Sequence, residues 1–512
     1  MDQLVQQVES LQLLNHVLLS LFLLVPMVLI ARTVVAGTRY SPILIIVIFG
    51  LAMGFILVVS DLAEPGLQAF PVIDLISKTT SVALLVTFFV GGQEIRKIFG
   101  NKVGATKDLL IHNEEEAVLG TTRTQMVLIV RSFFLLIGVE AMSRLILGLD
   151  GGPLSNYYPI MAYLGIVASI ILIDSKAKIL EKPLYIRKGM LEIIVLIGIS
   201  IIAFHLSELV HNIVALPSIF FGMVISTLLG VYAYSYVFGP TIKALLFAGI
   251  PVVLAGNFMV GGSRIIEVFE MDGSAAVLGY GFFGQAFWMF GGMALMIYFG
   301  KTAAVRNLAP GMAGALSHTG LTGACTAGDL GKRAANRAPM LVNIPFAMHI
   351  FVFSTLAVSY ERGSLLMIPA VIMVAIGFAL LVMGLRNMKV PGNDDRAEMK
   401  SLLQFGFGWQ LIAIFGGLAV LDLSGMAVDF AAMAKASAIS HFGLFAGVQE
   451  GMFGAEAAGL ITFTFSMTFL VHPFVFYMFG KAMENNEEMP KTPVYVLAIV
   501  GLIGILSSLL FL

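Results

Sequence analysis

Two copies of the pattern Ser-His-x-Gly-Leu hold the residues of this chain that are best suited to bind a solute or move a proton. The first copy runs from Ser317 to Leu321 and the second from Ser440 to Leu444. Each lies in a stretch rich in glycine and small residues. Glycines let a helix unwind, and the freed carbonyls and amides can coordinate a cation or hold an anion at membrane depth. The two copies are therefore candidate broken helices of a binding site.

The first candidate segment, residues 308–326, is rich in hydroxyl groups and contains a histidine, and Asp329 follows it. Serine and threonine oxygens are suitable ligands for Na⁺, and His318 can hydrogen-bond a carboxylate or carry a proton. The alternative is close helix packing through small residues, with the hydroxyls bonded to the preceding turn. We favour a site, because histidine and aspartate are costly inside a membrane if they serve packing alone.

The predicted site draws on both segments and on the span that follows the first. The predicted substrate-binding residues are Ser317, His318, Thr319, Gly320, Thr322, Arg337, Asn343, Ser440, His441 and Gly443. The residues predicted to bind Na⁺, or a proton in its place, are Ser317, Thr322, Thr326, Asp329, Gln449 and Glu450. Arg337 would attract an anion, although a loop that only obeys the positive-inside rule also contains such residues.

These residues must be positioned by membrane-spanning helices. Of the 512 residues, 58% are hydrophobic and 12% are charged, against about 25% charged in a soluble domain. Apolar runs of roughly 20 residues, long enough to cross a bilayer, recur along the chain. The net charge of -1 gives no basic arm for nucleic acid, and the single cysteine excludes an intrachain disulfide. We therefore expect an all-α polytopic membrane protein.

About 14 spans are predicted, in addition to two re-entrant segments at 308–326 and 436–452. The predicted spans are 13–36, 41–60, 76–95, 126–147, 157–174, 190–211, 214–236, 241–260, 274–300, 339–359, 364–385, 404–421, 455–479 and 492–512. Placing the basic loops in the cytoplasm requires each of the two segments to return to its own side. They would then enter the membrane from opposite faces.

A second repeated pattern points to the same inversion. Phe88-Phe89-Val90-Gly91-Gly92 is matched by Phe258-Met259-Val260-Gly261-Gly262, with the two copies ending spans on opposite sides. Such similarities predict inverted-topology repeats. Three parts are expected: residues 1–190, residues 191–385 with the first broken helix, and residues 386–512 with the second. Within one span, Glu140 and Arg144 have the spacing of a helical ion pair.

Residues 191–353 resemble the bacterial glutamate/sodium symporter family. Ala215 to Ser226 looks like that family's Leu-Pro-led span, and Ser317 to Gly320 is similar to its Gly-His-x-Gly broken helix. The resemblance implies a homodimer in which a transport domain moves against a scaffold, an elevator-type mechanism. It also implies the bacterial cytoplasmic (inner) membrane. The family's motif is missing between residues 100 and 190, and Thr322 and Ala324 replace two of its glycines.

The expected function is sodium-coupled symport of a small anionic solute, a carboxylate such as glutamate. Proton-coupled anion transport or exchange, or a non-transporting membrane subunit of a larger complex, are the alternatives. An enzyme is not expected, since the chain has no Walker, His-Glu-x-x-His or nucleophile-elbow motif. No cofactor is predicted beyond Na⁺ as the coupling ion. The expected partners are the substrate, the lipid bilayer and a second copy of the chain.

Overall fold

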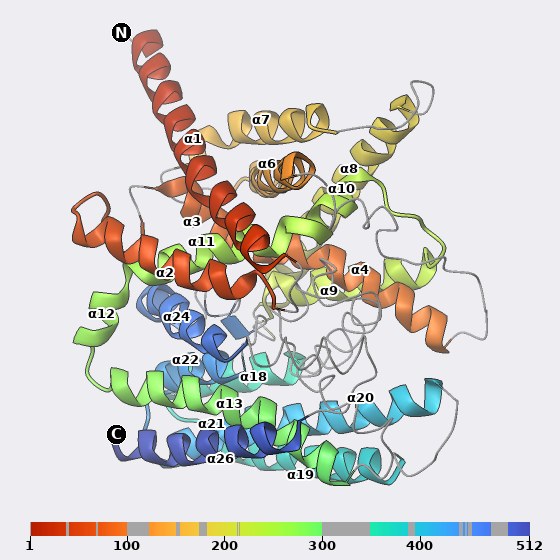
Figure 1. Cartoon of the computed structure of the whole chain (residues 1–512), viewed down its shortest axis with the longest axis vertical. Coiled ribbons are helices and arrows are strands. Elements are labelled where there is room, and N and C mark those ends of the chain that lie inside the picture. The colour runs from red at the N-terminus through yellow and green to blue at the C-terminus, as the bar shows by residue number, and fades with distance from the viewer. Residues whose placement is uncertain are drawn as a thin grey trace.

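The computed structural model of the chain is a bundle of helices, several of which lie side by side across the view in Figure 1. Every regular element within the described residues is helical. The structure describes residues 2–36, 40–67, 70–99, 122–149, 154–173, 182–211, 213, 216–299, 349–387, 395–439, 444–445, 448, 453–472 and 490–511.

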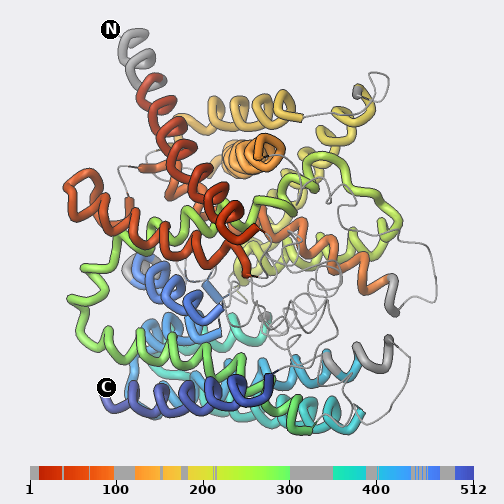
Figure 2. The backbone as a smooth tube through the Cα atoms, viewed as in Figure 1, coloured from red at the N-terminus to blue at the C-terminus, as the bar shows by residue number. Residues whose placement is uncertain are grey.

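The described helices can be followed along the chain by colour in Figure 2, first those before residue 300 and then those after residue 348. The first group is α1 (Asp2–Val35), α2 (Ile43–Val59), α3 (Pro71–Lys78), α4 (Thr80–Phe99), α6 (Thr122–Leu147), α7 (Tyr158–Ile171), α8 (Lys182–Val210), α9 (Ser218–Tyr232), α10 (Pro240–Ala244), α11 (Ile250–Ser263), α12 (Ile265–Glu270) and α13 (Ser274–Phe299). The second group is α18 (His349–Arg362), α19 (Met367–Asn387), α20 (Asp395–Leu411), α21 (Gly417–Leu423), α22 (Val428–Ala438), α24 (Gly454–Thr468) and α26 (Lys491–Ser508).

The chain is a multi-pass helical membrane protein by the length and composition of its helices. Within the described ranges, 9 helices are long and apolar enough to cross a membrane, and four shorter apolar helices accompany them. Each of the predicted spans overlaps a helix of the structure. An apolar 18-residue stretch of Pro240–Ser263 is fully buried, whereas only 22% of the corresponding stretch of Met367–Asn387 is buried. The former is therefore central, and the latter presents its apolar side chains outward to lipid.

Helices α4 and α9 cross at two glycines that allow their backbones to touch. A methyl group added at Gly230 of α9 would overlap the carbonyl oxygen of Phe89 in α4. A methyl group added at Gly92 of α4 would overlap the carbonyl oxygen of Thr227 in α9. Small residues allow such close approach between membrane helices, where dispersion contacts replace the hydrophobic effect as the source of stability.

Helices α2 and α11 cross in the same way. A methyl group at Gly54 of α2 would overlap the carbonyl oxygen of Met259, and one at Gly262 of α11 would overlap that of Leu51. The two contacts use matching positions of the repeated pattern. Met259 and Gly262 of its second copy correspond to Phe89 and Gly92 of its first copy. The sequence repeat thus corresponds to a repeated helix–helix contact.

In the part of the chain that the structure describes, two helices contain a π-turn, a one-residue widening that leaves backbone carbonyls without their helical partners. The turn η2 (Leu245–Gly249) joins α10 to α11, and η3 (Ile412–Gly416) joins α20 to α21. At η2, Arg32 of α1 donates from Nη2 to the carbonyl oxygen of Phe247 at 2.6 Å, and its guanidinium lies 3.9 Å from the Phe247 ring centroid. The hydroxyl of Ser132 donates to the carbonyl of Ala244 at 2.6 Å. Side chains from two other helices therefore fix this turn.

The break between α3 and α4 was not predicted, and its surroundings differ from those of η2. Residues 76–95 were expected to form one span, and Pro71–Arg96 is long and apolar enough to cross a membrane as one segment, but within it α3 ends at Lys78 and α4 begins at Thr80. Pro71 starts α3 just as Pro240 starts α10, so both interrupted segments begin alike. The break at Thr79 borders a polar cavity, whereas η2 is closed by Arg32 and Ser132.

Candidate functional site

The residues predicted to form the site lie outside the part of the chain that the structure describes. This holds for Ser317, His318, Thr319, Gly320, Thr322, Thr326, Asp329, Arg337, Asn343, Ser440, His441, Gly443, Gln449 and Glu450. Of the second Ser-His-x-Gly-Leu copy, only Leu444 is described, and it is buried. Whether the two copies meet at one site therefore stays a prediction, as does the division of the chain into three parts.

A polar cavity of about 300 Å³ lies at the break between α3 and α4. Helices α6, α8 and α9 form its other walls. Its polar lining residues are Lys78, Thr80, Ser81, Glu140, Ser143, Arg144, Ser200 and Ser218. The volume is at the lower end of the range of about 300–1,000 Å³ found for ligand sites, which suits a small solute.

Three hydroxyl groups donate hydrogen bonds to backbone carbonyl oxygens near the end of α3. The hydroxyl of Ser77 donates to the carbonyl of Asp74 at 2.7 Å, and that of Thr79 donates to Ile76 at 2.7 Å. The hydroxyl of Thr80 donates to the carbonyl of Ser77 at 3.2 Å. The carbonyl groups give the C-terminal end of α3 a partial negative charge, which would repel an anion beside the first turn of α4. The hydroxyl hydrogen bonds reduce this charge.

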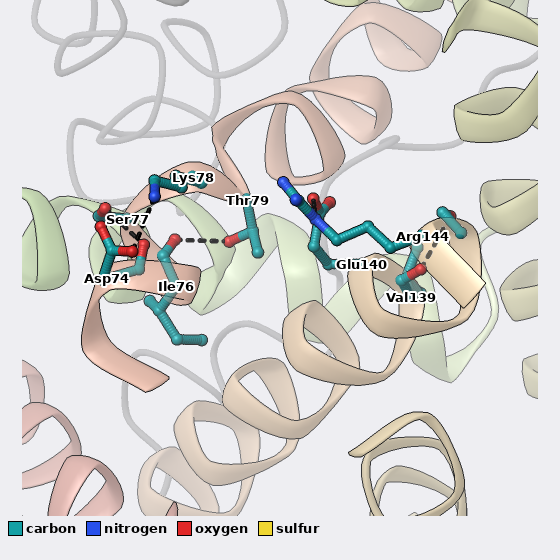
Figure 3. Close-up of polar contacts among 9 residues, drawn as sticks. Asp74, Ile76, Ser77, Lys78, Thr79, Val139, Glu140 and Arg144 are labelled. Carbon is teal, nitrogen blue, oxygen red and sulfur yellow. Dashed lines mark hydrogen bonds and ion pairs between the residues drawn. The ribbon is translucent and has the colours of Figure 1, made fainter. Parts of the chain in front are cut away.

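Two ion pairs contribute side chains to the cavity lining, Lys78–Asp74 of α3 and Arg144–Glu140 of α6, and Figure 3 shows both pairs. Lys78 Nζ lies 2.7 Å from Asp74 Oδ2, and these side chains are 46% and 36% exposed. Arg144 Nε lies 2.7 Å from Glu140 Oε1, with side chains 26% and 15% exposed. The partial exposure leaves both cations within reach of a solute in the cavity.

The cavity combines features that suit a carboxylate. Lys78 and Arg144 carry several N–H donors each; the ion pairs described above use one donor of each side chain, and Arg144 also hydrogen-bonds Tyr158. The first turns of α4 and α9 reach the cavity through Thr80 and Ser218, and helix N-termini favour negative charge. Within the residues that the structure describes, no group of three or more His, Cys, Asp or Glu side chains could hold a metal ion.

The sequence predicted part of this site. The predicted ion pair between Glu140 and Arg144 is confirmed, and it also lines the cavity. Lys78 and the hydroxyl residues of the lining were missed. The available signal was the polar run from Lys78 to Ser81 inside an otherwise apolar span.

A second polar cluster holds the start of α10. Glu192 of α8 is buried, and its carboxylate accepts the backbone amides of Gly239, Thr241 and Ile242 at 2.5, 3.0 and 3.2 Å. Tyr236 also donates its hydroxyl to Glu192 at 3.0 Å, and burial together with this carboxylate raises the pKa of Tyr236. The cluster therefore caps the N-terminus of α10.

The same helix start is held from its other side by Arg131 of α6. Its guanidinium donates to the carbonyl oxygens of Ser169 and Pro240 at 2.8 and 2.7 Å and to the hydroxyl of Thr241 at 3.3 Å. Opposite charges on α6 and α8 thus fix one end of α10, which is a structural task.

Replacing Glu192 with glutamine is expected to destabilise the protein by about 1–3 kcal/mol, since the neutral amide has one acceptor oxygen for donors that the carboxylate shared between two. Thermal unfolding of the detergent-solubilised chain would measure the loss. Glu208→Gln is the control, because Glu208 is 57% exposed and lies 3.6 Å from His205. Equal melting temperatures for the two variants would contradict the capping role.

The cavity is the main guide to the function of this chain, because known proteins offer no match. No protein-family model, curated protein or solved structure matches this chain.

Proposed function

We propose that this protein is a sodium-coupled secondary transporter of a small anionic solute, a carboxylate such as glutamate. The observation that carries the proposal is the cavity at the break between α3 and α4, with Lys78 and Arg144 on its walls. Polar residues at helix breaks within a membrane are where secondary transporters bind their substrates. The hydroxyls and two cations favour a carboxylate over an apolar solute.

The repeated helix crossings support an alternating-access mechanism built from inverted repeats. The contact of α4 with α9 and that of α11 with α2 use glycines at matching positions of the repeated pattern. Because each repeat contributes one helix to each crossing, a shift of one repeat changes both crossings at once. An elevator-like movement between two equivalent arrangements is our proposal for the cycle.

Sodium coupling rests on the sequence. The candidate ligands are hydroxyl, amide and carboxylate groups of 317–329 and 449–450, and the resemblance of residues 191–353 to the glutamate/sodium symporter family points the same way. We extend the proposal to a homodimer in the cytoplasmic membrane of a bacterium.

The test is uptake of radiolabelled L-glutamate, succinate and bicarbonate, one at a time, into proteoliposomes that contain the full chain. We expect a Na⁺ gradient to drive accumulation of at least one anion, and Arg144→Gln to prevent it. Uptake that follows a pH gradient in Na⁺-free buffer would identify proton coupling instead. Absence of flux for all three anions, together with stable co-purification of a second polypeptide, would favour the membrane-subunit alternative.

A further inference from the structure

A groove of about 960 Å³ lies along the first turns of α8 and contains two basic side chains. Arg187 and Lys188 line the groove, together with Tyr236 from the connection between α9 and α10. Lys188 Nζ lies 4.7 Å from the ring centroid of Tyr236, and this cation–π contact holds the ammonium beside the groove. The remaining lining residues are apolar. The groove therefore combines two positive charges with an apolar surface.

An apolar crevice of about 210 Å³ adjoins this groove, between α8, α4 and α9. Helix α9 packs on both of the other helices, as can be followed in Figure 1. The groove and the crevice are continuous, because Leu191 and Tyr236 line both. Leu85 and Leu196 in the crevice are buried, whereas Leu191 and Val195 are 55% and 44% exposed. The crevice is therefore open on the side of α8 that faces lipid.

The cation and the crevice lie on one face of α8. Lys188, Leu191, Val195 and Ile199 follow one another at intervals of three or four residues, which is the spacing of a single helical face. Ile199 is 11 residues beyond Lys188, a distance of about 16 Å along the helix. That distance is close to half of the roughly 30 Å hydrocarbon core, or one leaflet. A ligand with its charge at Lys188 and a chain along this face would have the length of a phospholipid.

The charges at this end of α8 favour a headgroup with a net negative charge. A further cation, Arg96 of α4, lies 6.0 Å from the ring centroid of Tyr234, on the connection that also contains Tyr236. Glu192 lines the crevice, but its carboxylate already accepts hydrogen bonds from three backbone amides and from the hydroxyl of Tyr236. Its negative charge is therefore offset locally. Basic pockets between membrane helices are sites where anionic lipid headgroups bind.

We propose that the groove and the crevice bind one anionic phospholipid. Arg187 and Lys188 donate hydrogen bonds to its phosphate oxygens, and one acyl chain fills the crevice along Leu191 and Val195. A free phosphate would leave the crevice unused, and the cations would repel the quaternary ammonium of a zwitterionic lipid. The groove is distinct from the anion cavity, although Leu85 lines both that cavity and the crevice. The inference does not depend on the proposed transport function.

The first test is thermal unfolding of the delipidated full chain in detergent, with dioleoylphosphatidylglycerol, dioleoylphosphatidylcholine or glycerol phosphate added. The anionic lipid should raise the melting temperature by several degrees, and the other two compounds should have little effect, because a ligand stabilises the state that it binds. Equal stabilisation by phosphatidylcholine would overturn the role of the cations. Equal stabilisation by glycerol phosphate would show a site for free phosphate. A melting temperature that rises with protein concentration and ignores lipid would assign the crevice to a second copy of the chain, against the proposal.

The second test removes the charges of the groove. Arg187→Gln with Lys188→Gln should weaken the binding of phosphatidylglycerol about 10- to 30-fold, measured from the lipid concentration that gives half of the stabilisation. Arg187→Lys with Lys188→Arg keeps both charges and should retain most of the binding. The matched control is Arg386→Gln with Lys491→Gln, which removes two exposed cations from the ends of α19 and α26. The same loss in the control as in the groove variant would overturn the site.

The third test fills the crevice without changing any charge. Val195→Trp should remove one tightly bound phosphatidylglycerol molecule per chain, counted by native mass spectrometry. Ile202→Trp is the control, because Ile202 lies on the same helix, is 52% exposed and lines neither the groove nor the crevice. Leu229→Trp fills the crevice from α9, where Leu229 is 38% exposed, and gives an independent result if Val195→Trp does not fold. Lipid counts equal to that of Ile202→Trp in the crevice variants would contradict the position of the acyl chain.

Discussion

Leucine in place of Gly54 or Gly230 is expected to prevent stable folding, with a cost of about 3 kcal/mol or more for each substitution. At both positions even a methyl group would overlap a carbonyl oxygen of the crossing helix, which is backbone and cannot move aside by changing a rotamer. In both crossings the added side chain would meet a backbone carbonyl oxygen, so the two losses of stability should be similar. Melting temperature and the monodisperse fraction in size-exclusion chromatography would measure them.

Gly198→Leu is the matched control for these substitutions. Gly198 lies in the interior of α8, and nothing stands within 4 Å of an added Cβ atom. Since leucine also has a higher helix propensity than glycine, this variant should be as stable as the wild type or slightly more stable. If Gly54→Leu and Gly230→Leu behaved like Gly198→Leu, the close crossings of α2 with α11 and α4 with α9 would be wrong.

Replacement of Arg144 with glutamine is expected to weaken anion binding roughly 10- to 100-fold, the effect of about 1.5–3 kcal/mol for a hydrogen bond to a charged group. The variant removes the cation from the cavity wall and leaves the Glu140 carboxylate, which repels an anion. Stabilisation of the purified protein by L-glutamate, succinate or bicarbonate in thermal unfolding would measure binding, because a ligand stabilises the state that it binds.

Two further variants separate the charge of Arg144 from its structural contribution. The double variant Glu140→Gln with Arg144→Gln removes both charges of the pair, so it should fold better than Arg144→Gln alone and still bind the anion weakly. Arg386→Gln at the exposed end of α19 is the control for a general loss of positive charge. Anion stabilisation that is equal in the wild type and Arg144→Gln would exclude the cavity as the binding site.

The helices could be predicted from the sequence because membrane spans are set by length and apolar composition. The predicted span 274–300 corresponds to α13, and 492–512 corresponds to α26 with the short turn that follows it. Interruptions were harder to predict. Thr79 breaks a helix through local hydroxyl bonds to carbonyls, and Leu245–Gly249 widens because Arg32 and Ser132 come from helices distant in the chain. The second cause leaves no trace in the hydrophobic pattern, whereas the first coincides with the polar run from Lys78 to Ser81.

The polar residues of the site were predictable only where they formed local pairs. Glu140 and Arg144 are four residues apart on one helix, so their contact follows from helical geometry. Lys78, Ser200 and Ser218 meet because three helices converge, and sequence spacing carries no information about that.

The π-turn at η2 has a consequence for how this chain tolerates insertions and deletions. A π-turn is equivalent to one residue inserted into an α-helix, and each residue of an α-helix turns by about 100°. Deletion of one residue from Leu245–Gly249 would therefore restore a regular helix and rotate Gly262 away from Leu51, although the deletion lies in a wholly apolar stretch. The fold therefore depends more on the length of this stretch than on the identity of its side chains.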